Sequence, residues 1–256
     1  MTNKTNSIMA TWALLLLTAT ASAVAASNRI VGGADASIET YPSIVQVEYL
    51  DLSVWSQGCG GNILSPTYVL TAAHCIDWVP MRIRAGSSDR NRGGTVVDVD
   101  SSLFHPDYTS LAPQHADIAL LRLQSPLVYG PGVQQVPIYA QGTEVPDNST
   151  VVHAGWGHTQ AAGLPSPVLQ DVTIYTVNYD ECFRRYGSAL SESMICAGIL
   201  DVGGKDACQM DSGGPLYYGE VLVGVVSWGY GCGSPRFPGV SIKVSAFTDW
   251  IVANVV

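Results

Sequence analysis

The stretch from Gly204 to Pro215 reads GKDACQMDSGGP and places one serine, Ser212, beside two glycines and a proline. Glycine and proline together predict a tight turn. A serine in such a turn is sterically accessible, and the adjacent glycines allow a carbonyl group to come close to the main chain. Ser212 is therefore a candidate nucleophile, and a turn with no other role is the simpler alternative.

Two further patterns concern a histidine and an aspartate: TAAHC at 71–75 and DIALL at 117–121. A single histidine such as His74 is more often structural than catalytic, but the adjacent Cys75 can fix the main chain, as a well-placed base requires. A carboxylate such as Asp117 at the start of an apolar strand is normally a turn residue or a cap, and if buried it needs a partner such as an imidazole N–H. Each pattern is weak alone, but together, in the order histidine, aspartate, serine, they are highly specific for nucleophilic catalysis.

The composition indicates a folded, β-rich protein. Of the 256 residues 47% are hydrophobic, which allows a sizeable core, and 26 glycines and 14 prolines imply many turns. The formal net charge is −9, and no cluster of lysine and arginine offers the basic face that a nucleic-acid partner requires. We interpret the acidic balance as a contribution to solubility.

The first residues have the pattern of a secretory signal peptide. Lys4 lies in a short polar start, residues 8–17 are mostly apolar, and small residues follow at 21–25. A membrane anchor is the alternative, but a membrane span needs about 20 apolar residues, and threonine and serine interrupt this segment. We predict a signal peptide over 1–23, cleaved at roughly 23–26, with no membrane association of the secreted product.

Secretion decides how the cysteines are interpreted. An even number in an oxidising compartment indicates three disulfides, for which the count alone allows 15 connectivities. A zinc site is the alternative, but the spacings typical of one are absent. The six cysteines are Cys59, Cys75, Cys182, Cys196, Cys208 and Cys232.

Short apolar stretches separated by turn residues are typical of β-barrels or sandwiches rather than of alternating βαβ units. One helix is predicted to begin at Asn178, whose spacing from Glu181 fits a capping box, and to end at Gly187. A second helix is predicted at the C-terminus, with Ser245 as its cap. The segment 125–137, rich in proline and glycine, is predicted to cross between two halves.

With these motifs taken together, the chain resembles the trypsins of the chymotrypsin-like serine protease family from residue 30 to residue 256. The resemblance rests on the three patterns above and on five more motifs, which follow one another along the chain in the order typical of the family. These motifs are RIVGG (29–33), CGG (59–61), AGWG (154–157), SWG (227–229) and PGV (238–240). It implies an all-β fold of two antiparallel six-stranded β-barrels, over about 43–124 and 138–244, with a C-terminal helix over about 245–256. It also implies the disulfides Cys59–Cys75, Cys182–Cys196 and Cys208–Cys232.

The same resemblance implies a serine endopeptidase that works through an acyl-enzyme intermediate. Ser212 is the expected nucleophile, His74 its general base, and Asp117 the carboxylate that orients the imidazole. The main-chain N–H groups of Met210 and Ser212 are the expected oxyanion donors. The family usually has glycine at position 210, so Met210 is expected to alter the leaving-group preference or the sensitivity to inhibitors.

The resemblance also implies a pocket for a cationic side chain. Asp206 matches the carboxylate at the base of the trypsin pocket, and cleavage after arginine or lysine is expected. Ala207 lacks the hydroxyl that many trypsins place there, so arginine, which pairs with a carboxylate bidentately, is expected to be preferred. Ser241 stands where the family usually has tyrosine. The remaining expected pocket residues are Ser227, Trp228, Gly229 and Gly239.

A zymogen is implied as well, with a propeptide over 24–29 ahead of the peptidase domain over 30–256. Cutting after Arg29 frees the ammonium group of Ile30, and Asp211 is its expected ion-pair partner. Before that cut Asp211 lacks a cation, and the main chain from Met210 to Ser212 is expected to be misplaced. Because the Asp206 pocket accepts arginine, self-activation is expected.

No cofactor and no metal are expected, since the loop 86–99 is short and has Ser87 where family members that bind calcium have an acidic ligand. The expected partners are protein or peptide substrates and proteinaceous protease inhibitors, and the expected state is a monomer. Asn148 begins an N-x-S/T glycosylation sequon. Two rivals remain open: an inactive homologue that serves as a binding module, and a protease of narrow regulatory specificity. The other histidines are interpreted as structural or surface residues: His105, His115, His153 and His158.

Overall fold

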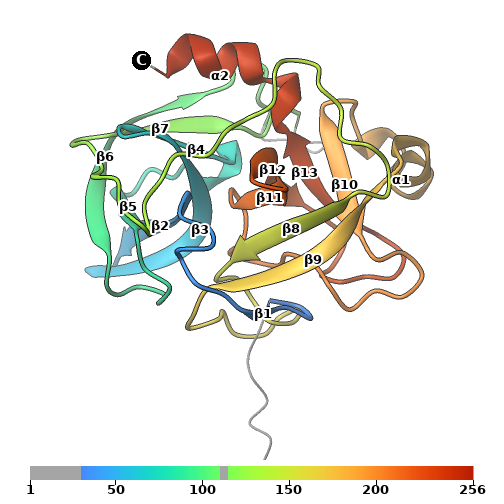
Figure 1. Ribbon diagram of the computed structural model, residues 1–256, viewed down its shortest axis with the longest axis horizontal. Helices are drawn as coiled ribbons and strands as arrows, with labels where there is room; N and C mark the ends of the chain where they lie inside the picture. The colour runs from blue at the N-terminus through green and yellow to red at the C-terminus, as the bar shows by residue number, and fades with distance from the viewer. Residues whose placement is uncertain (1–29, 110–114, 256) are drawn as a thin grey trace, which may run out of the picture.

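The computed structural model describes residues 30–109 and 115–255. Arg29, the signal peptide and the propeptide lie outside the described residues. Figure 1 shows two groups of strands side by side, with the C-terminal helix packed along their outer edge. The first group is a closed antiparallel barrel in the order β2-β3-β4-β7-β6-β5. Its strands are β2 (Ile44–Asp51), β3 (Val54–Ser65), β4 (Tyr68–Thr71), β5 (Met81–Ala85), β6 (Thr95–Phe104) and β7 (Ala119–Leu123).

The second group closes in the same way. Six strands pair in the order β9-β10-β13-β12-β11-β8, and β8 also pairs with β9, which completes the ring. A short strand, β1 (Ala34–Asp35), adds to the edge of β9. The strands of this barrel are β8 (Thr150–Gly155), β9 (Gln170–Val177), β10 (Met194–Gly198), β11 (Pro215–Tyr218), β12 (Val221–Trp228) and β13 (Gly239–Lys243).

The prediction of two six-stranded antiparallel barrels is therefore confirmed. Valine, isoleucine and leucine fill both interiors, since β-branched side chains suit the pleated, half-buried surface of a strand. The larger apolar cluster runs through both barrels, and the smaller lies in the second, around Ile30, Val151 and Ile174. The segment 124–149 connects the barrels, so the catalytic motifs, which come from different barrels, meet where the two pack together.

The first predicted helix forms as expected. α1 (Tyr179–Tyr186) begins after Asn178, whose side chain accepts hydrogen bonds from the N–H groups of Asp180 and Glu181, and it ends at Gly187. Gly187 has φ +61° and ψ −141°, a backbone conformation that glycine adopts more readily than residues with a side chain.

The second predicted helix begins later than expected. α2 (Thr248–Asn254) follows a separate 3₁₀ turn, η3 (Val244–Ala246), so Ser245 is not its cap. The carbonyl of Ser245 accepts from the N–H of Gly142 instead of from a helical N–H. The side chain of Gln141 supplies the cap, because its Oε1 accepts from the N–H of Asp249 at 3.0 Å.

Three disulfides link the six cysteines: Cys59–Cys75, Cys182–Cys196 and Cys208–Cys232. They close loops of 16, 14 and 24 residues, each of which contributes on the order of 3 kcal/mol by the chain-entropy model. Among the helices of the described residues, none has the length and apolar character that a membrane crossing requires.

Candidate active site

His74 and Asp117 come from different parts of the first barrel and meet at its edge. His74 lies in the 3₁₀ turn η1 (Ala73–Cys75), directly after β4, and Asp117 lies two residues before β7. The imidazole Nδ1 is 2.7 Å from Asp117 Oδ2, and the main-chain N–H of His74 donates to Oδ1 at 2.8 Å. Both the ring and its main chain are therefore fixed to one carboxylate.

Asp117 is fully buried, and its charge is held by hydrogen bonds. Besides His74, the hydroxyl of Ser227 donates to its Oδ2 at 2.5 Å. Ser227 belongs to β12 of the second barrel, so this carboxylate joins the two barrels. A carboxylate accepts only, so the Nδ1 atom facing it carries the proton, which leaves Nε2 of a neutral ring as the acceptor.

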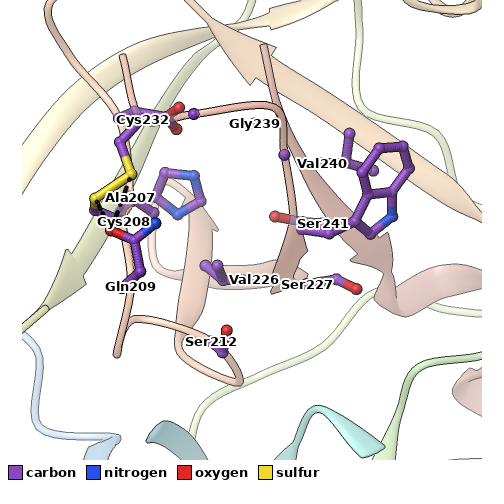
Figure 2. Close-up of a pocket in the computed structure, with 15 residues that line it drawn as sticks. Ala207, Cys208, Gln209, Ser212, Val226, Ser227, Cys232, Gly239, Val240 and Ser241 are labelled. Atoms are coloured by element: carbon purple, nitrogen blue, oxygen red, sulfur yellow. Dashed lines mark hydrogen bonds between the residues drawn. A yellow bond between two sulfur atoms is a disulfide. The ribbon is translucent and has the colours of Figure 1, made fainter. Parts of the chain in front are cut away.

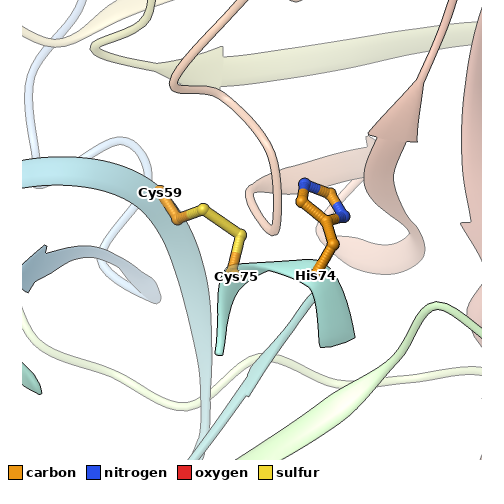
Figure 3. Close-up of side chains that lie close together, drawn as sticks. All are labelled: Cys59, His74 and Cys75. Carbon is orange, nitrogen blue, oxygen red and sulfur yellow. A yellow bond between two sulfur atoms is a disulfide. The ribbon is translucent and has the colours of Figure 1, made fainter. Parts of the chain in front are cut away.

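The main chain of His74 is anchored by the next residue. Cys75 forms a disulfide with Cys59 on β3, and Figure 3 shows the imidazole and the disulfide leaving η1 in different directions. Among the described residues, one group of potential metal ligands lies close enough together to hold an ion, and it consists of Cys59, His74 and Cys75. Because a disulfide offers no thiolate, this cluster is unsuited to a metal ion.

Ser212 comes from the second barrel and is tied to the first through the main chain. Its carbonyl accepts from the N–H of Gly60 at 2.8 Å, one residue from the disulfide that anchors His74. Gly213, which follows, has φ +78°, and an added Cβ would lie 2.5 Å from the carbonyl oxygen of Gly60. Glycine is therefore required at 213 for the two barrels to meet this closely. No hydrogen bond joins the Ser212 hydroxyl to the His74 ring among the bonds of the described residues.

A pocket of about 210 Å³ opens beside Ser212. Figure 2 shows Ser212 at one end, the Cys208–Cys232 disulfide along one side, and Val240 and Ser241 on the other. It is smaller than the roughly 300–1,000 Å³ typical of sites for drug-sized ligands, which suits a single side chain. All six residues predicted for the pocket line it: Asp206, Ala207, Ser227, Trp228, Gly229 and Gly239.

Asp206 is a buried carboxylate with one oxygen unused. Its Oδ2 accepts from the N–H of Gly233 at 3.0 Å, whereas Oδ1 has no partner among the described residues. Burial raises the pKa of Asp206 to about 7, against the hydrogen bonds from Gly233 and Ala207. A Cβ at Gly239 would come within 2.6 Å of Oδ1, so this position of the carboxylate requires glycine at 239.

Asp211, the residue before Ser212, is also buried without a cation among the described residues. Its carboxylate accepts from the N–H groups of Gly157 at 2.8 Å and Cys208 at 2.9 Å. Burial raises the pKa of Asp211 to about 7. Ile30, at the start of the described chain, is fully buried in the apolar cluster of the second barrel.

Met210 occupies a conformation that favours glycine. Its φ is +72°, which costs a residue with a side chain roughly 1–2 kcal/mol. The conformation is supported from the first barrel, because Gln57 Nε2 donates to the carbonyl of Met210 at 2.8 Å. Arg90 in turn donates to Gln57 Oε1 at 2.7 Å and lies 3.7 Å from the sulfur of Met210.

The peptide group between Gln209 and Met210 has a fixed orientation. The carbonyl of Gln209 accepts from the N–H of His158 at 2.8 Å. In a trans peptide the N–H points away from the carbonyl, so the N–H of Met210 is turned to the opposite side. Neither this N–H nor that of Ser212 has a partner among the described residues, which leaves both free to donate.

Among the pocket residues that sequence reasoning did not assign to the pocket, one is titratable, His153. It was interpreted as structural or surface, yet it is buried on β8 and lines the pocket with Asp206 and Ser241. A signal was available, because His153 directly precedes the AGWG motif at 154–157. Pairing across strands decides what it faces, however, and a single sequence does not reveal that pairing.

Comparison with known proteins agrees with this geometry. The family described as Trypsin matches residues 30–251. Alkaline trypsin B of Manduca sexta is 42% identical over 251 residues, which cover 94% of this chain and 98% of that protein. A trypsin of Phaedon cochleariae is 41% identical, over 87% of this chain and 86% of its own length. The vitellin-degrading protease of Bombyx mori is 38% identical, over 98% and 95%. The chain therefore belongs to the trypsin family of serine-type endopeptidases.

Proposed function

We propose that this protein is a secreted endopeptidase that cleaves after arginine, and less readily after lysine, and that it is made as a zymogen. The observation that carries the proposal is Asp206. Its carboxylate is buried at the pocket, and within the described part of the chain Oδ1 is unpaired and no cation contacts it. A buried carboxylate of this kind is unfavourable until a cation enters, so a cationic substrate side chain is the natural ligand.

The preference for arginine rests on the acceptors near Asp206. Ala207 offers no hydroxyl, so an ammonium group finds fewer acceptors than its three N–H groups require. A guanidinium group can form two parallel hydrogen bonds with one carboxylate. Equal kcat/KM for matched arginine and lysine substrates would refute this preference.

In the proposed mechanism Ser212 attacks the carbonyl carbon of the substrate while His74 Nε2 takes the hydroxyl proton. The imidazolium that forms is stabilised by Asp117, which is 2.7 Å from its Nδ1. His74 then gives the proton to the leaving amine as the peptide bond breaks, and the acyl-enzyme remains. Water, deprotonated by His74, attacks the acyl-enzyme and releases the acid and Ser212. This is the reaction sequence of the chymotrypsin-like triad.

The negative charge that develops on the carbonyl oxygen is assigned to the N–H groups of Met210 and Ser212. Both are unpaired among the described residues, and the first is oriented by the bond between His158 and Gln209. Donors that already point at the developing charge are worth about 3–4 kcal/mol each in comparable sites. A side chain at Met210 leaves its main-chain N–H in place.

Activation is proposed to follow cleavage after Arg29. Ile30 is already seated in the apolar interior of the second barrel, and Asp211 is a buried acid without a cation. A new ammonium group at Ile30 would supply that cation. An Asp206→Asn zymogen tests self-activation, because it has lost the pocket for Arg29. Maturation of this variant in isolation at the normal rate would show that another protease makes the cut.

Secretion and the remaining partners follow from the same features. Three disulfides in a chain of this size are typical of oxidising compartments, which supports a signal peptide over 1–23 and a propeptide over 24–29. Protein substrates and proteinaceous protease inhibitors are the proposed partners, and the protein is proposed to act as a monomer.

The function is tested by covalent labelling after cleavage at Arg29. A serine-reactive phosphonate is expected to add to Ser212 in equal molar amount, and a peptide library is expected to show cuts after arginine and lysine. Ser212→Ala is the matched control and is expected to take up no label. If the correctly cleaved protein takes up no label, it is an inactive homologue. If it takes up label but shows no preference for arginine or lysine before the cut bond, the assignment of Asp206 is refuted.

A further inference from the structure

We propose that His153 is a further specificity-determining residue, whose imidazole Nε2 accepts a hydrogen bond from the cationic group of the substrate side chain. The proposal rests on the proposed function, because it concerns the side chain that the Asp206 pocket takes. It gives that pocket a second acceptor, which is neutral and comes from a strand outside the loop that carries Asp206.

The position of His153 is fixed by the barrel. It lies on β8, where it pairs with Val172 of β9 and Leu216 of β11, and it is 3% exposed. Its ring lines the same pocket as Asp206, Ala207 and Ser241. A strand inside a closed barrel leaves little freedom for movement, so the ring is held against the pocket wall.

The hydrogen bond on the other side of the ring determines its tautomer. Nδ1 is 3.0 Å from the carbonyl oxygen of Pro215. A carbonyl oxygen only accepts, so Nδ1 carries the hydrogen and donates it, and Nε2 of the neutral ring has a free lone pair. Burial lowers the pKa of His153 to about 4, so the ring is neutral at physiological pH.

The Nε2 atom is available to a ligand. Among the described residues no hydrogen bond involves it, and it is not one of the fully buried polar atoms that lack a partner. Because the ring lines the pocket, we assign the exposed part of Nε2 to that pocket. A ligand that donates a hydrogen bond to Nε2 therefore gains an interaction without displacing a hydrogen bond within the protein.

The chemistry of the pocket favours a cation with several N–H groups. Asp206 supplies the charge and one unpaired oxygen, and the side chain of Ala207 supplies no acceptor. A guanidinium group has five N–H donors and an ammonium group has three, so each needs acceptors beyond Oδ1. An imidazole nitrogen meets this need without a second negative charge beside Asp206, which would raise the cost of burial.

The test compares two substitutions that treat the acceptor differently. In the activated protein, His153→Leu is expected to lower kcat/KM for arginine and lysine peptides about 10- to 100-fold, mainly through KM, and to weaken benzamidine binding by a similar factor. His153→Gln keeps an amide acceptor and is expected to stay within about threefold of the parent. For a matched peptide with citrulline, which is neutral, His153→Leu is expected to lower kcat/KM by a smaller factor than for the arginine peptide.

The control is Val151→Ala, which lies on the same strand, is fully buried, and is not among the residues that line the pocket. It is expected to destabilise the barrel without changing the ratio of arginine to citrulline turnover. If His153→Leu leaves that ratio unchanged while the parent protein strongly prefers arginine, the role of His153 is refuted and the proposed function stands. If the parent protein itself shows no preference, the proposed function fails first.

A measurement on the unsubstituted ring covers the case in which His153→Leu does not fold. In ¹⁵N-histidine-labelled, activated protein carrying Ser212→Ala, the Nε2 resonance of His153 is expected to be that of an unprotonated nitrogen. Addition of benzamidine is expected to shift it, with Nδ1 remaining protonated. A protonated Nε2 in the free protein, or an unchanged Nε2 shift at saturating benzamidine, would overturn the proposal.

Discussion

Glu48 in the first barrel and Asp206 in the second are both buried carboxylates, but among the residues that the structure describes Glu48 has cationic partners and Asp206 has none. Both oxygens of Glu48 accept from arginines, Oε2 from Arg82 and Oε1 from Arg84, each at 2.6 Å. Asp206 Oδ2 accepts from the main-chain N–H of Gly233, and its second oxygen is unpaired among the described residues. Burial raises the pKa of Asp206 to about 7.

The difference distinguishes a buried charge that stabilises the fold, Glu48, from one that is proposed to bind a cation from outside, Asp206. The first barrel neutralises its buried acid internally, so Glu48 contributes to the fold and has no capacity for a ligand. Within the described residues the second barrel buries Asp206 and Asp211 without cations. In our proposal the cations arrive from the substrate and from the new N-terminus at Ile30. Asp117 is intermediate, because its partner His74 becomes a cation only during the reaction.

Asp117→Asn is expected to have the largest effect. The amide would favour the wrong tautomer of His74 and would not stabilise its protonated form. We expect kcat to fall roughly 10⁴-fold, the magnitude that this substitution has in the family's reference triad. The melting temperature is expected to change only slightly. Single-turnover acylation kinetics measure the fall in kcat, and a fall of less than about tenfold would remove Asp117 from the mechanism.

Glu48→Gln is expected to act on stability alone. It leaves two arginines facing a neutral amide, and breaking a buried pair in this way typically costs about 3–5 kcal/mol. Urea unfolding measures the loss, and kcat/KM per folded molecule is expected to be unchanged. Asp100→Asn is the control, because Asp100 and Arg122 form an exposed pair at 3.7 Å, which is worth about 1 kcal/mol or less. Equal losses from the two substitutions would contradict the account of Glu48.

The unpaired acids are expected to make the uncleaved chain less stable as the pH rises. With a pKa of about 7, Asp206 binds a proton in the folded state that the unfolded chain has already lost near pH 4. Each such group lowers stability by up to about 1.4 kcal/mol per pH unit between these values. Stability measured from pH 4.5 to 7 in the Ser212→Ala background is expected to fall less steeply when Asp206→Asn is added.

His153 acts in the opposite direction over part of this range, because its pKa is lowered to about 4. It is present in both proteins, as is Asp211, so their contributions cancel in the difference. Identical pH slopes for the two proteins would show that Asp206 is already ionised in the folded chain below neutral pH.

Met210→Gly is expected to have the smallest effect. Glycine adopts a φ of +72° without strain, so stability is expected to rise by about 1 kcal/mol. The contact between Arg90 and the Met210 sulfur would be lost, and we expect a severalfold change in leaving-side preference or inhibitor affinity. If peptide-library preference and inhibitor affinity both stay unchanged, Met210 has no role in recognition.

Patterns in the sequence predicted those features that depend on contacts between residues close together in the chain. The cap of α1 was predictable because Asn178 bonds to N–H groups two and three residues along the chain. The start of α2 was not, since its capping group comes from Gln141, 108 residues before Asp249. The same distinction separates the anchor beside His74, which the adjacent Cys75 indicated, from the pocket face of His153, which depends on pairing among three strands.

The resemblance to a family supplied what single residues could not, namely the barrels and the pairing of the cysteines. It did not predict how the departures from the family pattern are accommodated. Met210 is supported by Gln57, more than a hundred residues away. Ser241 shares the pocket with His153 from a different strand. Each of these depends on a contact between the barrels or across a sheet.

The most direct test of the central claim, that Asp206 awaits a substrate cation, is the ratio of kcat/KM for two peptides that differ only in arginine or citrulline before the cut bond. We predict a ratio of about 100 or more for the activated protein, and a ratio near one after Asp206→Asn. A ratio near one in the parent protein, or a large ratio that survives Asp206→Asn, would contradict the account.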